Sequence, residues 1–364
     1  MESTPKKGRW LIHVIIFTVI FSVLFASVSY VVRRQHDAFK KNKNGYEQHT
    51  TPIDAVCIGG SSTYIYWIPM RAWNEYGYTS FNYSGDSMSP SVIKYLIEES
   101  RRHETAKLYV IDLRAAEIMQ HNPSFYSEEY VRIYTDAMPY SLNRINMVHY
   151  SIEKNGLVPK NTASMYLDLI YYHGNWREID RYSYRPQENL YARHMKGFYF
   201  YNSPPVPQTL TDYSMVTERC ELTPELESTL RDLLDYCKAE NLNALFLVNA
   251  FSEKDSSVKA LYNSVEDLIG SYGYDFLDTN DYYEEIGLDA DMDLYDKNHV
   301  NIFGAIKYTD FVSKYIHDNF ELPDHRGDPA FSSWEEDYRI YQEAETNFIS
   351  EYCITNNITK EAEQ

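Results

Sequence analysis

The sequence has few cysteines and no metal-binding spacing. Its four cysteines, Cys57, Cys220, Cys237 and Cys353, are far apart in a chain of 364 residues. No Cys-x-x-Cys pair occurs, and no Cys/His cluster has the spacing of a zinc site. This scarcity excludes a disulfide-stapled scaffold, and we expect neither a bound metal ion nor another cofactor.

Positive charge is scarce beyond the first fifty residues. Residues 51–364 carry 26 Lys and Arg against 50 Asp and Glu, a formal charge of −24. Such a domain repels phosphate backbones, so we expect no nucleic-acid partner. The hydrophobic fraction of 44% is nevertheless that of a globular protein, and the chain is long enough for one large or two smaller domains.

The longest uncharged run lies near the N-terminus. Residues 10–32 contain no Asp, Glu, Lys or Arg, and about 20 apolar residues suffice to cross a bilayer. The run is longer than the apolar core of a typical signal peptide, and no small-x-small cleavage site follows it. We therefore expect a single-pass transmembrane anchor, with residues 1–9 as a cytoplasmic tail and residues 33–52 as a stalk.

Basic residues flank this anchor on both sides, three before it and five soon after it. A count of positive charges alone favours a cytoplasmic location for the C-terminal side. However, a short N-terminal tail before one long domain is the usual plan of a signal anchor, and long domains translocate largely regardless of charge. We expect a cell-membrane protein with an extracytoplasmic domain, and the cytoplasm-facing orientation is the alternative.

Residues 53–322 alternate between strand-like and helical segments. This alternation predicts an α/β domain with a flavodoxin-like parallel sheet flanked by helices. In such sheets the ligand site lies at the carboxyl ends of the strands. Apolar runs and helical spacing predict strands at 54–60, 78–85, 106–114, 243–251 and 274–280, and helices at 62–77, 89–103, 223–242, 256–273 and 303–320.

Residues 115–222 interrupt this alternation. Helical patterns cover 127–138, 141–156 and 162–174, and a polar, Tyr-rich stretch follows them. We expect a mostly helical insertion within the α/β domain.

Asp296 and His299 form an Asp-x-x-His motif before the last predicted helix. The spacing lets the Asp296 carboxylate reach Nδ1 of the imidazole while Nε2 points towards the sheet edge. An Asp in this position fixes the tautomer and stabilises the imidazolium of a general-base His. A helix-capping Asp beside a surface His gives the same pattern, so the motif is informative only together with a nucleophile.

An EF-hand calcium loop is excluded nearby. Asp289, Asp291 and Asp293 alternate as calcium ligands do. An EF-hand starting at Asp289 would need Gly at its sixth position and Glu at its twelfth. Leu294 and Val300 occupy those two positions instead.

Three motifs in this order resemble the SGNH/GDSL hydrolase superfamily. IGGSS, residues 58–62, closes the first predicted strand, and FNYSGDS, residues 81–87, closes the second. The Asp-x-x-His motif precedes the last helix. The resemblance extends over about residues 53–320 and implies an SGNH-hydrolase fold with a Ser-His-Asp triad.

Within this resemblance, the first motif implies that Ser61 is the nucleophile. Gly60 stands where the family usually has Asp, and Ser62 is the close rival. The second motif implies that the backbone N–H of Gly85 serves the oxyanion hole together with that of Ser61. Ser87 belongs to a Gly-Asp-Ser tripeptide, but it follows the second strand and is therefore not the expected nucleophile.

The third family motif, Gly-x-Asn-Asp, is absent, and Asp112 and Arg114 end the third strand instead. The anchor, the Gly-Ser-Ser motif and the insertion look most like the branch that contains the teichoic-acid D-alanyl transfer protein and the alginate acetylation proteins. This likeness implies an extracytoplasmic serine esterase or O-acyltransferase acting on an acylated surface glycopolymer. A non-catalytic binding or assembly protein on the same fold is the alternative, favoured by the missing motif.

Residues 323–364 are predicted to form an amphipathic helix and an acidic tail. Ser333 and Glu336 have the spacing of a capping box, and aromatic residues recur on one helical face. This stripe is expected to pack on its own domain or to dock on a partner, such as a membrane protein that supplies the acyl donor. It contains Trp334, Tyr338, Tyr341, Phe348 and Tyr352.

Overall fold

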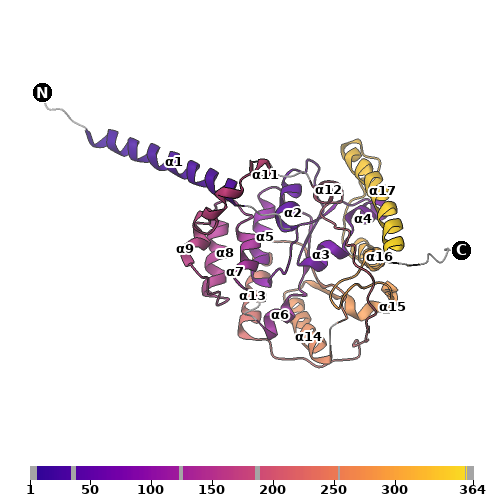
Figure 1. Ribbon diagram of the computed structural model, residues 1–364. Coiled ribbons are helices and arrows are strands. Elements are labelled where there is room, and N and C mark those ends of the chain that lie inside the picture. The colour runs from indigo at the N-terminus through magenta and orange to yellow at the C-terminus, as the bar shows by residue number, and fades with distance from the viewer. Residues whose placement is uncertain are drawn as a thin grey trace.

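The protein is an α/β domain built on a five-stranded parallel sheet, and an apolar helix projects from it (Figure 1). The computed structural model describes residues 6–33, 38–122, 126–184, 189–252, 255–356 and 358. The start of the predicted cytoplasmic tail and the end of the predicted acidic tail lie outside these residues.

The strand order is β2-β1-β3-β4-β5, which is the flavodoxin-like order. The parallel sheet flanked by helices is therefore confirmed. Its inner strands are buried at every residue because helices cover both faces of the sheet. The strands are β1 (Ala55–Ile58), β2 (Ser80–Asn82), β3 (Leu108–Asp112), β4 (Ala244–Val248) and β5 (Asp275–Asp278).

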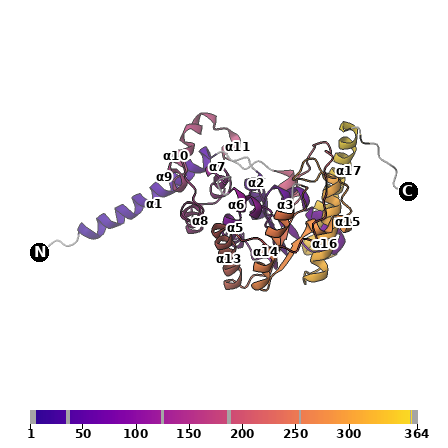
Figure 2. The ribbon, with the colours of Figure 1, turned by 90° about the horizontal axis from the view of Figure 1, so that it is seen from below.

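Helices lie on both faces of this sheet (Figure 2). They are α3 (Ser61–Tyr66), α4 (Pro69–Tyr76), α5 (Pro90–Arg101), α13 (Pro224–Ala239), α14 (Ser256–Ser271), η3 (Thr279–Tyr282), α15 (Tyr283–Ile286) and α16 (Ile302–Asn319). On one face α5 packs beside α13, and on the other α4 packs beside α16. The single helix predicted at 62–77 is divided into α3 and α4, because Pro69 removes a backbone donor and disfavours helical geometry at Ile68.

The described helices of the insertion at 115–222 lie between residues 116 and 193, and the described residues from 194 to 222 form neither helix nor strand. The predicted helices at 127–138 and 141–156 are present, whereas the one at 162–174 is broken into short pieces. The elements are α6 (Ala116–His121), α7 (Glu128–Thr135), α8 (Leu142–Glu153), α9 (Thr162–Tyr166), α10 (Leu169–Tyr172), η2 (His173–Glu178), α11 (Arg181–Tyr184) and α12 (Leu190–Arg193).

The predicted stalk is in part a packed helix, α2 (Ala38–Glu47). Phe39 and Tyr46 lie seven residues apart on one side of α2, and both are fully buried. At Gly45 a Cβ atom would lie 2.7 Å from the carbonyl oxygen of Ala192, so only glycine lets α2 approach α12 this closely. The lysines of this segment suggested a polar linker, but the two aromatic residues fix it to the domain.

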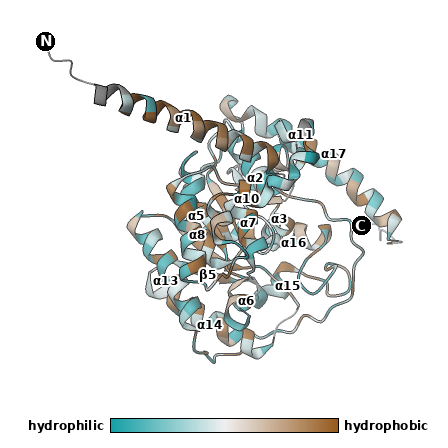
Figure 3. Ribbon diagram, turned by 60° about the vertical axis from the view of Figure 1, so that its left-hand side comes forward, coloured by the Kyte–Doolittle hydropathy of each residue, from teal (hydrophilic) through white to brown (hydrophobic). Residues whose placement is uncertain are grey.

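The helix α1 (Lys6–Val32) projects away from the domain (Figures 1 and 3). Its segment Trp10–Val32 is long and apolar enough to cross a membrane. Near the other end of the chain, α17 (Ser332–Thr355) packs against α4.

The aromatic stripe of α17 packs on its own domain. Trp334, Tyr341 and Tyr352 are buried, and the ring of Trp334 lies 5.3 Å from that of Trp73. The predicted capping box is wrong, because α17 already begins at Ser332 after η4 (Pro329–Phe331) and its N-cap makes no side-chain hydrogen bond.

Candidate active site

Ser61 lies at the carboxyl end of β1, where a two-glycine turn leads directly into α3. A Cβ atom on Gly59 would lie 2.2 Å from Oγ1 of Thr63 and 2.6 Å from Cβ of Asp112. Glycine is therefore required for the strand, the helix and the end of β3 to meet. This close turn places Ser61 at the sheet edge as the first residue of α3.

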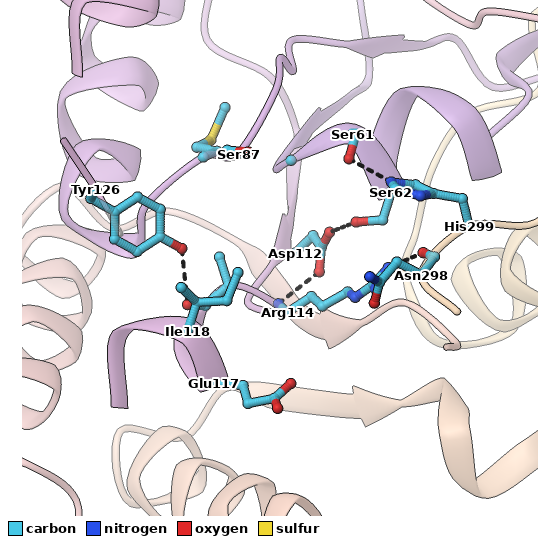
Figure 4. Close-up of a pocket in the computed structure, with 13 residues that line it drawn as sticks. Ser61, Ser62, Ser87, Asp112, Arg114, Glu117, Ile118, Tyr126, Asn298 and His299 are labelled. Carbon is cyan, nitrogen blue, oxygen red and sulfur yellow. Dashed lines mark hydrogen bonds between the residues drawn. The ribbon is translucent and has the colours of Figure 1, made fainter. Parts of the chain in front are cut away.

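Ser61, His299 and Asp296 form a continuous hydrogen-bonded chain. Figure 4 shows the contact between Ser61 and His299. Oγ of Ser61 lies 2.8 Å from Nε2 of His299. On the other side of the ring, Nδ1 of His299 lies 3.0 and 3.1 Å from the two carboxylate oxygens of Asp296. The structure thus brings together three residues that are up to 238 positions apart in sequence.

The loop that carries His299 is held by its neighbours on several sides. The guanidinium of Arg114 donates to the backbone oxygen of Asn298 and, at 2.6 Å, to its side-chain oxygen. The hydroxyl of Tyr66 donates to the same backbone oxygen at 3.0 Å. The ring of Tyr295 stacks on the imidazole of His299 with centroids 5.4 Å apart and planes within 4°. These contacts fix the position of the imidazole before a ligand binds.

The charge of Asp296 is favoured by its surroundings. Burial alone would raise the pKa of this carboxyl group, but hydrogen bonding and the charge of His299 lower it below its ordinary value. The amide of Asn298 contributes in the same direction by donating to the carboxylate at 2.6 Å. An ionised Asp296 stabilises a protonated His299, as a general-base mechanism requires.

Ser62, the rival nucleophile, points to a different partner. Its hydroxyl donates to Oδ2 of the buried Asp112 at 2.6 Å. The same oxygen accepts from the side-chain amide of Asn249 at 2.7 Å, and the other accepts from the backbone of Arg114 at 2.9 Å. Ser62 therefore joins the ends of β1, β3 and β4 through Asp112. Asn249 was not predicted from the sequence. Its position directly after β4 nevertheless indicates that it lies at the carboxyl edge of the sheet.

The backbone amide of Gly85 has a partner within the fold. Its N–H donates to the carbonyl oxygen of Gly59 at 3.3 Å. A Cβ atom on Gly85 would lie 2.4 Å from Cβ of Phe39, so this glycine is required for packing against α2. The Gly85 amide is therefore already engaged within the fold, and its oxyanion role stays a prediction. The amide of Ser61 remains a candidate, because the first N–H groups of a helix have no partner within it.

Ser61 and His299 open into a cavity of about 330 Å³, which is at the small end of the range for ligand pockets. Ser87 lines the cavity as well and has a left-handed backbone, with φ of 47°. Figure 4 shows Ser87 apart from the Ser61–His299 contact, so its presence does not make it part of the triad. The other lining residues are Gly60, Ser62, Met88, Asp112, Arg114, Ala115, Glu117, Ile118, Tyr126 and Asn298.

The alternating aspartates before the triad have structural partners. Asp293 is buried and pairs with Lys307 at 2.7 Å, and it also accepts from the amide of Asp289. Asp289 in turn accepts from the amide of Asp291 at 2.9 Å. In the described parts of the chain, no three His, Cys, Asp or Glu side chains are grouped so that they could hold a metal ion.

Comparison with known proteins gives no match. No protein-family model, no curated protein and no solved structure matches this chain. The chemical interpretation of the site therefore depends on its own geometry.

Proposed function

We propose that this protein is a membrane-anchored serine esterase or O-acyltransferase of the SGNH type. The observation that carries the proposal is the 2.8 Å contact between Ser61 Oγ and His299 Nε2, with Asp296 on the far side of the ring. A serine hydroxyl is a weak nucleophile by itself, and an adjacent oriented imidazole is the usual means of activating it. The location at the carboxyl edge of a parallel sheet supports the same proposal.

In the first half-reaction, Ser61 Oγ attacks the carbonyl carbon of an acyl ester while His299 takes the hydroxyl proton. The tetrahedral intermediate then collapses and the bond to the leaving alcohol oxygen breaks. His299 returns the proton to that oxygen, and the acyl group remains on Ser61. The Ser61 amide is placed to stabilise the oxyanion, and one such donor contributes roughly 3–4 kcal/mol in serine enzymes.

In the second half-reaction, an acceptor hydroxyl gives its proton to His299 and attacks the acyl carbonyl. The bond to Ser61 breaks, and Ser61 recovers the proton from His299. Water as the acceptor gives an esterase, whereas a polymer hydroxyl gives a transferase. The small cavity supports a short acyl group.

The cellular setting of this proposal is the outer side of a membrane. α1 supports anchoring, and the motif resemblance supports an acylated surface glycopolymer as substrate. A membrane protein that supplies the acyl donor remains the proposed partner. Because the stripe of α17 is occupied by its own domain, such a partner would need another surface.

Labelling with a fluorophosphonate tests the proposal, because such a probe reacts with an activated serine. Wild-type protein should be labelled, and Ser61→Ala should abolish labelling. Ser87→Ala is the matched control: it removes a hydroxyl from the same cavity, and labelling should be preserved. Both variants should melt at the wild-type temperature.

Labelling that persists in Ser61→Ala would remove Ser61 as the nucleophile. Loss of labelling in a folded Ser62→Ala variant, with Ser61→Ala still labelled, would move the nucleophile by one residue. A folded wild-type protein that resists the probe and cleaves no ester would favour the non-catalytic binding or assembly protein.

A further inference from the structure

The last turns of α1 are fixed to the helical insertion by specific contacts. Phe25 packs against the ring of Tyr140 at 5.9 Å, and the Tyr140 hydroxyl donates to Ser29 at 3.2 Å. Arg33, directly after α1, pairs with the buried Asp168 at 3.0 Å. Asn175 donates to the backbone oxygen of Val32 at 3.2 Å. The domain is therefore attached rigidly to its anchor.

This attachment begins within the apolar segment itself. The part of α1 before Phe25, residues 10–24, is only roughly 22 Å long at 1.5 Å per residue. The hydrocarbon core of a bilayer is about 30 Å thick. For the helix to cross that core, the end of the domain that holds residues 25–32 must come about 8 Å into the bilayer boundary.

The elements around this end expose large apolar side chains. α10, η2 and α11 contact α1, and α8 begins two residues after Tyr140 (Figures 1 and 3). Trp176 on η2 is 61% exposed. We call this set the base surface; it consists of Leu142, Leu167, Ile170, Trp176 and Tyr184, all of which are exposed.

We infer that the base surface lies in the interfacial region of the membrane, around the point where α1 enters it. Interfacial segments insert apolar side chains by about 5–10 Å, which agrees with the depth that the length of α1 requires. Tryptophan and tyrosine are enriched at this level of a bilayer because their rings are amphipathic. The inference depends on α1 crossing a membrane but not on the chemistry proposed for Ser61.

Lipid is favoured over a partner protein as the occupant of the base surface. The surface is continuous with a helix whose apolar segment is long enough to span a membrane, and the two are joined by buried contacts. Any insertion of α1 therefore carries the base surface to the headgroup level without a further binding step. A partner protein would have to displace lipid from the same place.

Depth-dependent fluorescence quenching tests the inference in the full-length protein. One accessible cysteine is introduced by Trp176→Cys or Ile170→Cys in a Cys220→Ser background, in which the remaining native cysteines are buried, and it is labelled with an environment-sensitive dye. The protein is reconstituted in vesicles of phosphatidylcholine and phosphatidylglycerol that contain a lipid with a nitroxide high on its acyl chain. Both labels should be quenched roughly fivefold more strongly than an aqueous control, because interfacial side chains lie within about 10 Å of that depth.

Met215→Cys provides the matched aqueous control. Met215 is also apolar and 87% exposed. The backbone oxygen of its neighbour Val216 accepts a hydrogen bond from Asn263 of α14, which lies away from α1. A label at Val19 checks that α1 is inserted. If the Val19 label is quenched while labels at 170 and 176 behave like the one at 215, the inference is wrong and the base surface needs a protein partner.

Discussion

The carboxyl edge of the sheet and the base of α1 both depend on buried polar groups, but the two regions use them differently. At the sheet edge, Asp112 is satisfied by neutral donors, and the triad beside it remains open to a cavity. At the base of α1, Arg33 and Arg144 share the buried Asp168, and Arg144 also pairs with Asp136 at 3.0 Å. The first arrangement leaves Ser61 and His299 accessible from the cavity, whereas the second fixes the end of α1 to the helical insertion.

This difference has an energetic consequence. Removing one partner of a buried ion pair leaves an uncompensated charge in a medium of low dielectric constant. Removing a reactive group that faces a cavity leaves water free to replace it. Substitutions of Ser61, His299 and Asp296 should therefore affect chemistry more than stability, and substitutions at the base of α1 should do the opposite.

The largest expected effect is on turnover at the sheet edge. His299→Ala and Asp296→Asn should each lower ester cleavage by about 10³- to 10⁴-fold, because Ser61 loses its base or the base loses its orientation. Initial rates on a chromogenic short-chain ester, with melting temperatures measured in parallel, check this. Near-native rates in either variant would exclude the triad.

The next effect is on stability at the base of α1. Arg33→Ala should lower the free energy of unfolding by about 3–5 kcal/mol, because Asp168 remains buried beside fewer cations. Thermal unfolding in detergent micelles measures this. Arg219→Ala, which breaks the exposed pair with Asp267, is the control and should leave the melting temperature unchanged. Equal melting temperatures for the two variants would show that the pair of Arg33 and Asp168 does not stabilise the attachment of α1.

A smaller effect on stability is expected at Ser62, which follows Ser61 in sequence but donates to the buried Asp112. Ser62→Ala removes a buried donor from Asp112 and should cost about 1–3 kcal/mol, while fluorophosphonate labelling of Ser61 continues. Denaturant unfolding and labelling of the same preparation check both parts. A variant that keeps full stability but loses labelling would show that Ser62 belongs to the chemistry.

The smallest effect concerns pH. Burial, together with the positive charge of Lys196, lowers the pKa of His49 to about 3, and the ring packs against Trp334 at 5.5 Å. Because the unfolded chain takes up this proton near pH 6.5, stability should decline as the pH falls from 7 to 5. His49→Gln should flatten the dependence of the melting temperature on pH. His121→Gln, at an exposed position, should leave the dependence as it is.

The site was largely predictable because its signals are local. Asp296 and His299 are three residues apart, and Ser61 directly follows an apolar strand that ends in two glycines. A parallel sheet brings strand ends to one edge, so these local patterns suffice to place them together. The contacts of Gly85 could not be predicted from local patterns. Its amide donates to the carbonyl oxygen of Gly59, and Phe39 of α2 packs where a side chain of residue 85 would lie.

The contacts at the base of α1 were poorly predicted because they join segments that are far apart in the sequence. Residues 33–52 are rich in charged side chains, and such side chains are expected to be exposed to solvent when their partners are unknown. This segment was therefore predicted to be a stalk. Arg33 meets Asp168 across more than a hundred residues, and Tyr140 meets Ser29 across a similar distance. Neither partner can be found from spacing.

The sequence by itself determined the apolar helix, the alternation that gives a parallel sheet, and the pairing of Asp296 with His299. Periodicity and short-range spacing encode these features, because each is a property of one segment. Only the tertiary structure decided that Ser61 rather than Ser62 reaches His299, that Gly85 packs against α2, and that α1 is joined to the domain by buried contacts. Those choices depend on which groups are buried together, and burial is set by contacts between segments far apart in the chain.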